Sequence, residues 1–169
     1  MEYDKPDEIQ SVASGFDTTF FRTKSFKDLK KVGSNYQLYP NGASFILSNS
    51  FLKAVKGLNE SYFLYFEELD LVKKGKKEGF KINYLIDKIV YHKGGGSTGK
   101  NSAFADYHYL KSRLMAVREH YSSKLPLLVI FTFFVYPFNR VLRGQYNRVS
   151  IMFKVFKDFF TSNSKATDL

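Results

Sequence analysis

Apolar side chains in the last third of the chain recur with the period of an α-helix. From Ala103 to about Tyr121 they fall at every third or fourth position, which predicts one helix with a single apolar face. A second stripe begins near residue 146, and the basic residues of that segment lie off it, as is typical of a helix in a membrane interface. This stripe consists of Tyr146, Val149, Phe153, Phe156 and Phe160.

The run from Leu125 to Phe138 lies between these two helices and carries no charged residue over fourteen positions. Pro126 suits the first turn of a helix, and Pro137 predicts a stop or a kink. A helix needs roughly 18–20 apolar residues to span a bilayer. We therefore expect a buried, re-entrant or interfacial helix here rather than a transmembrane one.

The first hundred residues show shorter patterns. Residues 10–40 alternate polar and aromatic positions without a helical period, which predicts short strands and loops. We also expect a buried strand over residues 43–47, and two further strands over residues 82–86 and 89–92. Residues 93–100 are expected to form a loop.

Two helices are predicted within this part of the chain. Ser48-Asn49-Ser50 offers N-caps for a helix over about 50–56, which Gly57 would end. A second helix is expected to begin near Glu67 and to end at Gly79. Its carboxylates lie in the first turn and its lysines in the last turn, which matches the helix dipole.

Composition restricts the chemistry available to the chain. Its 169 residues, 44% of them hydrophobic, are enough for one ordinary core. The absence of cysteine excludes disulfides, thiolate zinc sites and a cysteine nucleophile, and three histidines leave little material for a histidine-rich metal cluster. The acidic N-terminus lacks the pattern of a signal peptide, so we expect the chain to start in the cytoplasm.

The net charge of +10 is concentrated in the shorter, C-terminal part of the chain. Residues 1–100 carry +4 and residues 101–169 carry +6, together with many of the 18 Phe and 12 Tyr. Such a segment suits an anionic partner, whether a membrane surface, a nucleic acid or a phosphorylated ligand. Basic residues off an apolar stripe, beside an uncharged run, favour lipid over nucleic acid.

A glycine-rich segment resembles a phosphate-binding loop but departs from it. Residues 94–100 fit G-x-x-x-x-G-K after an expected strand and before an expected helix. The next residue is Asn101 instead of the Ser or Thr that would hold Mg²⁺. The 69 residues that follow Lys100 are mostly expected helices, so they cannot supply the later strands of a nucleoside-triphosphatase fold. A flexible glycine loop beside a site is the better interpretation.

Three carboxylates, Glu67, Glu68 and Asp70, directly follow a run of aromatic residues. Carboxylates at a helix start can simply complement the helix dipole. Adjacent carboxylates beside an apolar wall can also raise one pKa and prepare a general base. Their spacing does not separate these interpretations. His92, at the expected end of a strand, is likewise either a structural residue or a contact to a metal or phosphate.

Taken together and in this order, several segments resemble the C-terminal part of the bacterial glycosyltransferase family 2 enzymes, in the rhamnosyltransferase-like branch. The resemblance covers residues 1 to about 122, and residues 3–10 look like the segment that follows the nucleotide-binding half in this branch. The other matched stretches are 39–47 (YPNGASFIL), 51–52 (FL), 57–60 (GLNE), 62–71 (YFLYFEELDL), 79–82 (GFKI) and 92–95 (HKGG), with Ser97 and Gly99.

The resemblance implies an α/β fold, the C-terminal half of a GT-A-type mixed sheet with flanking helices. It implies inverting transfer of a sugar from a nucleotide-sugar donor to a saccharide or lipid-linked saccharide acceptor, with a divalent cation, Mg or Mn. Glu68 falls on the carboxylate that deprotonates the acceptor, although many relatives have Asp there. Glu67 falls on its acidic neighbour and His92 on a metal and diphosphate contact. The implied substrate-binding residues are Asp70, Gly94, Gly95 and Ser97.

The N-terminal half of that family, with its nucleotide loops and Asp-x-Asp metal motif, has no counterpart here, because no Asp-x-Asp occurs in the sequence. We therefore expect residues 1–122 to form a half domain that catalyses little alone, and a separate nucleotide-binding half is one way to complete it. The alternative is a noncatalytic membrane-surface or protein-interaction module derived from a glycosyltransferase.

Residues 123–169 are expected to be a helical membrane-association segment that holds the protein peripherally to the cytoplasmic face of the cell membrane. Its cations would meet anionic headgroups; they include Arg140, Arg143, Arg148, Lys154 and Lys157. The alternative without a membrane is that the apolar stripe packs onto the nucleotide-binding half of the family, because a truncated domain exposes surface that resembles a core.

Overall fold

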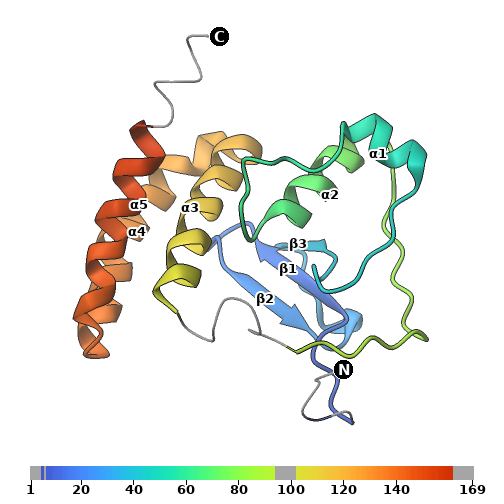
Figure 1. Cartoon of the computed structure of the whole chain (residues 1–169), viewed down its shortest axis with the longest axis horizontal. Helices are drawn as coiled ribbons and strands as arrows, with labels where there is room; N and C mark the ends of the chain where they lie inside the picture. The colour runs from blue at the N-terminus through green and yellow to red at the C-terminus, as the bar shows by residue number, and fades with distance from the viewer. Residues whose placement is uncertain (1–4, 6, 94–101, 162–169) are drawn as a thin grey trace. The chain divides into compact units, whose positions relative to one another are not determined.

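The computed structural model of the chain describes residue 5, residues 7–93 and residues 102–161. The chain forms two compact units, whose elements are labelled in Figure 1. The first, the sheet unit, comprises Met1–Tyr62 and Glu67–Ser97, and the second, the helical unit, comprises Phe63–Phe66 and Thr98–Leu169. The compact units thus divide the chain near residue 97. The boundary expected at residues 122–123 rested on membrane association and stays a prediction.

The sheet unit contains a three-stranded antiparallel sheet, as the pattern over residues 10–40 predicts. Its strands are β1 (Ala13–Asp17), β2 (Thr23–Phe26) and β3 (Tyr36–Tyr39), with β1 in the centre, and a short 3₁₀ turn, η1 (Leu29–Lys31), precedes β3. Gly15 of β1 faces Lys24 of β2 and Leu38 of β3. A Cβ at Gly15 would press against the Phe26 ring, so the central strand needs glycine at this position.

Two helices accompany the sheet, and both expectations for them are confirmed. Helix α1 (Asn49–Val55) begins where Ser48 Oγ accepts a hydrogen bond from the Phe51 N–H at 3.1 Å, and α2 (Glu67–Lys77) places its acids first and its lysines last. The helices pack through Gly75, whose missing side chain makes room for the Phe51 ring. That ring meets Phe80 edge to face, with centroids 5.2 Å apart.

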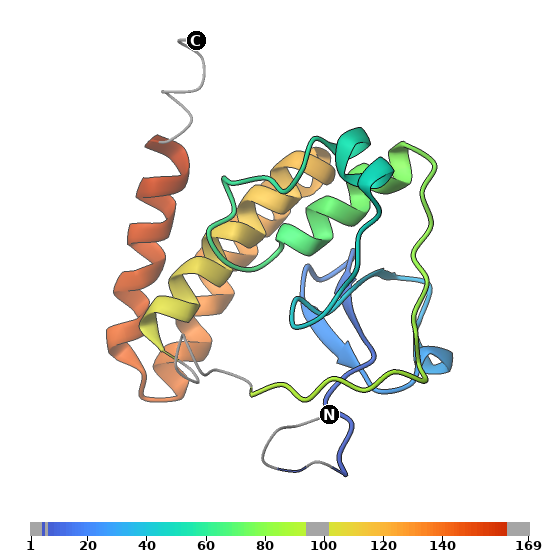
Figure 2. The same ribbon diagram turned by 45° about the vertical axis from the view of Figure 1, so that its right-hand side comes forward.

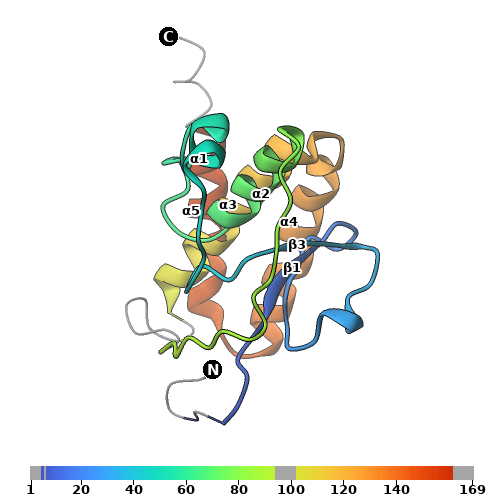
Figure 3. The same ribbon diagram turned by 90° about the vertical axis from the view of Figure 1, so that its right-hand side faces the viewer.

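The strands expected over residues 43–47, 82–86 and 89–92 are absent from the described part of the sheet unit. Residues 80–91 are irregular without ladder pairing, with a turn at Ile86 and Asp87, and His92 makes an isolated bridge. Figure 3 shows this segment after α2 as a trace without arrows. Alternation of apolar residues is a local property, whereas a ladder needs a partner strand. No partner strand lies beside these segments within residues 7–93, so those three expectations are wrong.

The helical unit consists mainly of three helices, α3 (Ala103–His120), α4 (Leu125–Leu142) and α5 (Val149–Thr161), which Figure 2 shows in yellow to red. Two 3₁₀ turns, η2 (Ser122–Lys124) and η3 (Tyr146–Arg148), join them. Helix α3 contacts both α4 and α5, so the expected packed helix is confirmed. Its single apolar face is not, because Ser112 and Arg113 are also buried and Phe104 is exposed. The buried side chains of the three helices include Leu110, Leu114, Val117, Leu128, Met152, Val155 and Phe159.

Two further expectations for this unit need correction. Of the stop or kink expected at Pro137, the stop is wrong, because α4 continues through the proline to Leu142. The apolar stripe of α5 is also divided. Phe156 is buried in the helical unit, whereas Phe153 and Phe160 are exposed. The third helix therefore contributes one row to the core and another to the surface.

Polar contacts link the three helices. Asp106 of α3 accepts hydrogen bonds from Tyr136 Oη at 3.2 Å, Arg148 Nη1 at 2.7 Å and Arg140 Nη2 at 3.3 Å. Tyr107 donates to Asp158 at 2.6 Å. Further inside, Arg113 Nη2 donates to Thr132 Oγ1 at 3.0 Å. Each contact joins α3 to one of the other two helices or to the turn between them, so the bundle has a defined register.

Candidate functional site

The carboxylates expected at the start of α2 have different surroundings. Asp70 is buried and forms an ion pair with Lys74, with Oδ2 and Nζ 2.8 Å apart. This i,i+4 pair is a common way to stabilise a helix. The implied role of Asp70 as a substrate contact stays a prediction.

Glu68 is partly buried and contacts the loop before α1. Its Oε1 occupies the space that a Cβ would take at Gly42. Burial, reinforced by the neighbouring charge of Glu67, raises the pKa of Glu68 to about 7. Complementarity to the helix dipole alone would lower that pKa. A raised pKa is not what dipole complementarity alone would produce, and the role of Glu68 as a base stays a prediction.

Glu67 shares this environment. Burial raises the pKa of its carboxyl group, and its Oε2 is buried without a hydrogen-bond partner among the described residues. A buried carboxylate oxygen without a partner is costly. It also helps to keep the neighbouring Glu68 partly protonated near neutral pH, because two adjacent negative charges repel each other.

The backbone just before these carboxylates is strained. Tyr65 and Phe66 have φ values of 66° and 71°, in the left-handed region that residues with a Cβ rarely adopt. Each such residue costs about 1 kcal/mol or more. Within the helical unit, Ser112 Oγ donates to the Leu64 carbonyl at 2.8 Å, and both aromatic rings lie near that of Tyr109. Strain of this kind often accompanies functional sites.

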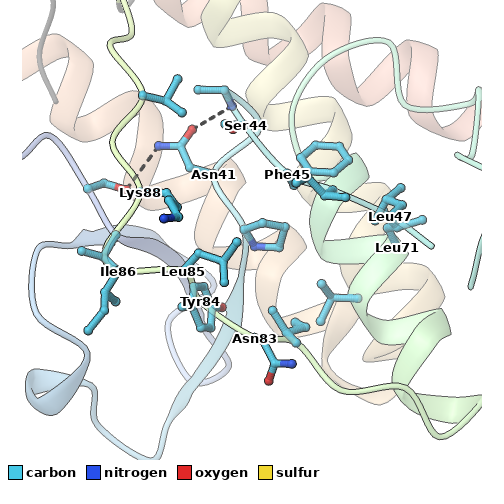
Figure 4. A pocket seen from close by; sticks show the side chains of 18 of the residues that line it. Asn41, Ser44, Phe45, Leu47, Leu71, Asn83, Tyr84, Leu85, Ile86 and Lys88 are labelled. Carbon is cyan, nitrogen blue, oxygen red and sulfur yellow. Dashed lines mark hydrogen bonds between the residues drawn. The ribbon is translucent and has the colours of Figure 1, made fainter.

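A cavity of about 840 Å³ lies within the sheet unit. Its wall comes from residues 9–12, the loop 40–48 apart from Gly42, parts of α1 and α2, and most of residues 80–92. Figure 4 shows apolar side chains such as Phe45 and Leu85 beside polar ones such as Asn41 and Lys88. A mixed lining of this kind suits a ligand with both apolar faces and hydroxyl groups.

The loop 40–48 connects the cavity with Glu68. Asn41 holds the loop by donating to Ser11 Oγ at 3.2 Å and by accepting from the Ala43 N–H at 3.1 Å. Both Asn41 and Ala43 line the cavity, and Gly42 between them contacts Glu68. The three carboxylates do not themselves line the cavity. The structure thus places Glu68 against one of the cavity's walls.

His92 does line the cavity, and its Nδ1 lies 3.0 Å from Gln10 Oε1. The resemblance implies a cation at His92. Within residues 7–93, however, His92 belongs to no group of three His, Asp or Glu close enough to hold one ion. The sheet unit as described therefore does not fit a divalent cation by itself. Gly94, Gly95 and Ser97 lie outside the described residues.

Sequence reasoning missed several polar side chains of the cavity, including Tyr84. Its Oη is buried without a hydrogen-bond partner among the described residues, and burial raises its pKa. Asn83 and Lys88 come from the same irregular segment (Figure 4). In the sequence, Tyr84 was grouped with Ile82 and Ile86 as the alternating positions of an expected strand, so its hydroxyl was not considered as a ligand contact. A buried hydroxyl beside a cavity is a natural hydrogen-bond donor to a ligand.

Comparison of the chain with models of known protein families, with curated proteins and with solved structures gave no match. The structure shows a mixed α/β fold and, in the sheet unit, a cavity with one wall against Glu68, whose pKa is raised by burial. The function is therefore argued from these residues and from the resemblance of their motifs.

Proposed function

We propose that the chain is the acceptor-side part of an inverting, family 2-like glycosyltransferase with a GT-A-type fold. The observation that supports this most is the contact between Gly42 and Glu68. They belong to two of the matched stretches, 39–47 and 62–71, which the sequence leaves unconnected. The cavity is lined by parts of the matched stretches 39–47 and 79–82 and by His92.

In the proposed reaction, the oxygen of an acceptor hydroxyl forms a bond to the anomeric carbon of the donor sugar. The bond from that carbon to the diphosphate oxygen breaks on the opposite face, and the nucleoside diphosphate leaves with the electron pair. Glu68 takes the hydroxyl proton. A pKa of about 7 suits this task near neutral pH, because the base is then both available and strong enough.

The cavity is the proposed site for the body of the acceptor. Glu68 does not line it, so the reacting hydroxyl would have to lie beyond the wall at Gly42, which Glu68 contacts. Sugar rings have apolar faces and a rim of hydroxyl groups, and the lining offers counterparts for both. Phe45 and Leu47 supply apolar surface, whereas Asn41 and Tyr84 supply polar groups. The acceptor would be a saccharide or a lipid-linked saccharide of surface polysaccharide assembly.

Donor binding is assigned to a separate nucleotide-binding half. His92 is one ligand, and a divalent cation needs several, so the partner would have to bring the others. The purified chain alone should therefore show no appreciable sugar transfer or nucleotide-sugar hydrolysis with Mg²⁺ or Mn²⁺. Metal-dependent turnover by the pure chain would contradict this two-part arrangement.

Complementation in the cells that carry the gene tests the function. Deletion should alter the surface polysaccharide or its lipid-linked precursors, and the wild-type chain should restore them. Glu68→Gln, expressed at the same level, should fail, because it removes the base and leaves the shape. Glu60→Gln is the control, since Glu60 is an exposed glutamate. Full rescue by Glu68→Gln would instead favour the noncatalytic module, and unchanged glycans after deletion would contradict the proposal.

Gly42→Ala offers a sharper test of the same site. The added Cβ would displace the tip of the flexible Glu68 side chain, so the fold should survive while the base moves. A shift of about 1 Å can cost a hundredfold in rate. Gly33→Ala is a matched control, because its Cβ would also press on a polar side-chain tip, Asn35 Oδ1. Equal rescue by both variants would remove the contact of Gly42 and Glu68 from the mechanism.

A further inference from the structure

The helical unit exposes a continuous apolar row along α4. The row repeats every three or four residues, so it lies on one side of the helix, and its members are Leu127, Ile130, Phe134, Phe138 and Val141. Phe134 and Phe138 are 65% and 64% exposed. We propose that this row, the α4 face, lies in the plane of a bilayer surface that contains anionic lipids. The proposal rests on the helical unit alone and does not depend on sugar transfer.

The α4 face continues onto α5. The ring of Phe133, beside the row, lies 6.1 Å from that of Phe153 and 5.5 Å from that of Phe156. Phe153 and Phe160 of α5 are exposed. Two neighbouring helices therefore present aromatic and aliphatic side chains together. A contiguous exposed apolar surface of this kind marks an interaction site.

The composition of α4 also argues against an ordinary core helix. By length and composition, Ser122–Leu142 could cross a membrane. Its most apolar 18-residue stretch has a mean hydropathy of 1.7, yet only 11% of that stretch is buried. A core helix of similar hydropathy would be mostly buried. The apolar side chains of α4 therefore face outward, where water is an unfavourable solvent for them.

Charge around the α4 face favours lipid over a second protein surface. Residues 121–161 contain six Lys and Arg but one acid, Asp158, which accepts a hydrogen bond from Tyr107. Arg140 and Arg148 are paired with Asp106, so they are not the headgroup contacts that the sequence had suggested. Lys154 is exposed and lies over the Tyr107 ring, with Nζ 5.1 Å from its centroid. The exposed cations left for headgroups therefore include Arg143 and Lys157. Anionic headgroups attract such cations, and the scarcity of carboxylates removes repulsion.

The opposite side of α4 explains why the helix should lie in the surface instead of crossing it. Leu128 and Thr132 are fully buried there, and Thr132 accepts a hydrogen bond from Arg113. Tyr136 and Arg140 both donate to Asp106 of α3. A crossing α4 would either lose these contacts or draw ionised groups of α3 into hydrocarbon, and both are unfavourable. With α4 in the interface, its apolar face enters lipid while α3 stays in water.

Flotation with vesicles tests the proposal. The full chain should bind vesicles of phosphatidylcholine with 30% phosphatidylglycerol at least tenfold more tightly than vesicles of phosphatidylcholine alone. The variant Ile130→Ser/Phe134→Ser/Phe138→Ser should lose about a hundredfold in binding, because three apolar insertions are removed. Its helix content should not fall, since these side chains are exposed. Phe63→Ser/Phe104→Ser removes two exposed rings elsewhere in the same unit and should bind like the wild type.

Two further double variants test whether binding depends on the cations near the α4 face or only on the net charge of the chain. Arg143→Gln/Lys157→Gln should weaken binding to the anionic vesicles by about tenfold or more. Lys30→Gln/Lys31→Gln makes the same change in net charge on the sheet unit and should weaken it much less. The proposal would be overturned if the wild type bound neither kind of vesicle, or if the serine variant bound the anionic vesicles as tightly as the wild type.

Orientation and self-association are tested with the same chain. It has no cysteine, so Ser123→Cys and Asn147→Cys each place one thiol near an end of α4. Added to intact vesicles, both variants should react with a membrane-impermeant maleimide, because an in-plane helix keeps both ends outside. Protection of one end would indicate a crossing helix and overturn the proposal. A lipid-free dimer that the serine variant dissociates, together with absent flotation, would assign the face to a second copy.

Discussion

In the sheet unit, Glu68 lies beside a second carboxylate, Glu67, whose Oε2 is buried without a hydrogen-bond partner among the described residues. In the helical unit, the partly buried Asp106 accepts hydrogen bonds from a tyrosine and two arginines. The two acidic sites therefore differ in their partners: Asp106 lies among hydrogen-bond donors, whereas Glu68 lies beside another carboxylate. Asp106 forms ion pairs with two arginines and joins helices, whereas burial and the neighbouring charge of Glu67 raise the pKa of Glu68.

The apolar residues of the two units differ in a similar way. Apolar side chains of the sheet unit surround a cavity together with Asn41, Tyr84 and Lys88. Those of α4 form an uninterrupted outer row. A mixed concave lining suits recognition of a small polar molecule, whereas a convex apolar row bordered by cations suits a lipid surface. This difference is consistent with the two proposals, catalysis in the first unit and membrane attachment in the second.

Asp106→Asn should have the largest effect on stability. Replacement leaves Arg140 and Arg148 without their carboxylate, and losing charged hydrogen bonds at this partly buried site costs about 2–3 kcal/mol. We expect the free energy of unfolding, measured by urea denaturation and circular dichroism, to fall by about that amount. Asp87→Asn is the control, because Asp87 is exposed and pairs only with its neighbour Lys88. A loss below about 0.5 kcal/mol would contradict a structural role for Asp106.

Glu68→Gln should instead increase the free energy of unfolding, and it should do so only at high pH. The ordinary pKa of the carboxyl group is 4.5, and the folded chain raises it to about 7. The stability that comes from favouring the protonated form is complete below the ordinary pKa and is lost as the pH rises through 7. At pH 8 the variant should therefore be more stable than the wild type by about 2–3 kcal/mol, and at pH 4 the two should be similar.

The measurement is urea denaturation of both proteins at pH 4, 6 and 8. Glu60→Gln controls for the loss of one negative charge on the surface. A stability difference between Glu68→Gln and the wild type that does not change with pH would show that the carboxyl group of Glu68 has no raised pKa.

Gly75→Ala should have a smaller effect, confined to the sheet unit. Alanine is a better helix former than glycine by about 1 kcal/mol, but its Cβ would overlap the Phe51 ring between α1 and α2. Overpacking of this kind costs about 1–3 kcal/mol, so we expect a net loss of about 1 kcal/mol. Lys77→Ala, at an exposed position of the same helix, should be nearly neutral. Stabilisation by Gly75→Ala would show that α1 does not pack on α2 as described.

The helices could be predicted from the sequence because their signals are local. Ser48 does cap α1, and the acids and lysines of α2 lie at the ends that the dipole favours. The period of α3 correctly indicated a packed helix. The continuation of α4 past Pro137 could not be predicted, since proline weakens a helix locally, whereas the contact of Arg140 with Asp106 beyond the proline is tertiary.

The strands and the site depend on partners that are distant in sequence, which limits their prediction. Residues 82–86 have a strand pattern but no partner strand among residues 7–93. Glu68 could be proposed as a general base from the sequence, because of the adjacent carboxylates and the family resemblance. Its contact with Gly42 could not be predicted, because nothing local connects two loops that fold together. Tyr84 was missed for the same reason: its burial beside the cavity is a tertiary property.

The most direct test of the account is the titration of the Glu68 carboxyl carbon by nuclear magnetic resonance, in the full chain at low salt. Its signal is assigned by its absence from the spectrum of Glu68→Gln. The account predicts a midpoint near pH 7, caused by burial and by Glu67. It also predicts a changed midpoint in Gly42→Ala, whose Cβ would displace this carboxylate. Titration of wild-type Glu68 at or below its ordinary value of 4.5 would contradict the claim that this chain carries a prepared base.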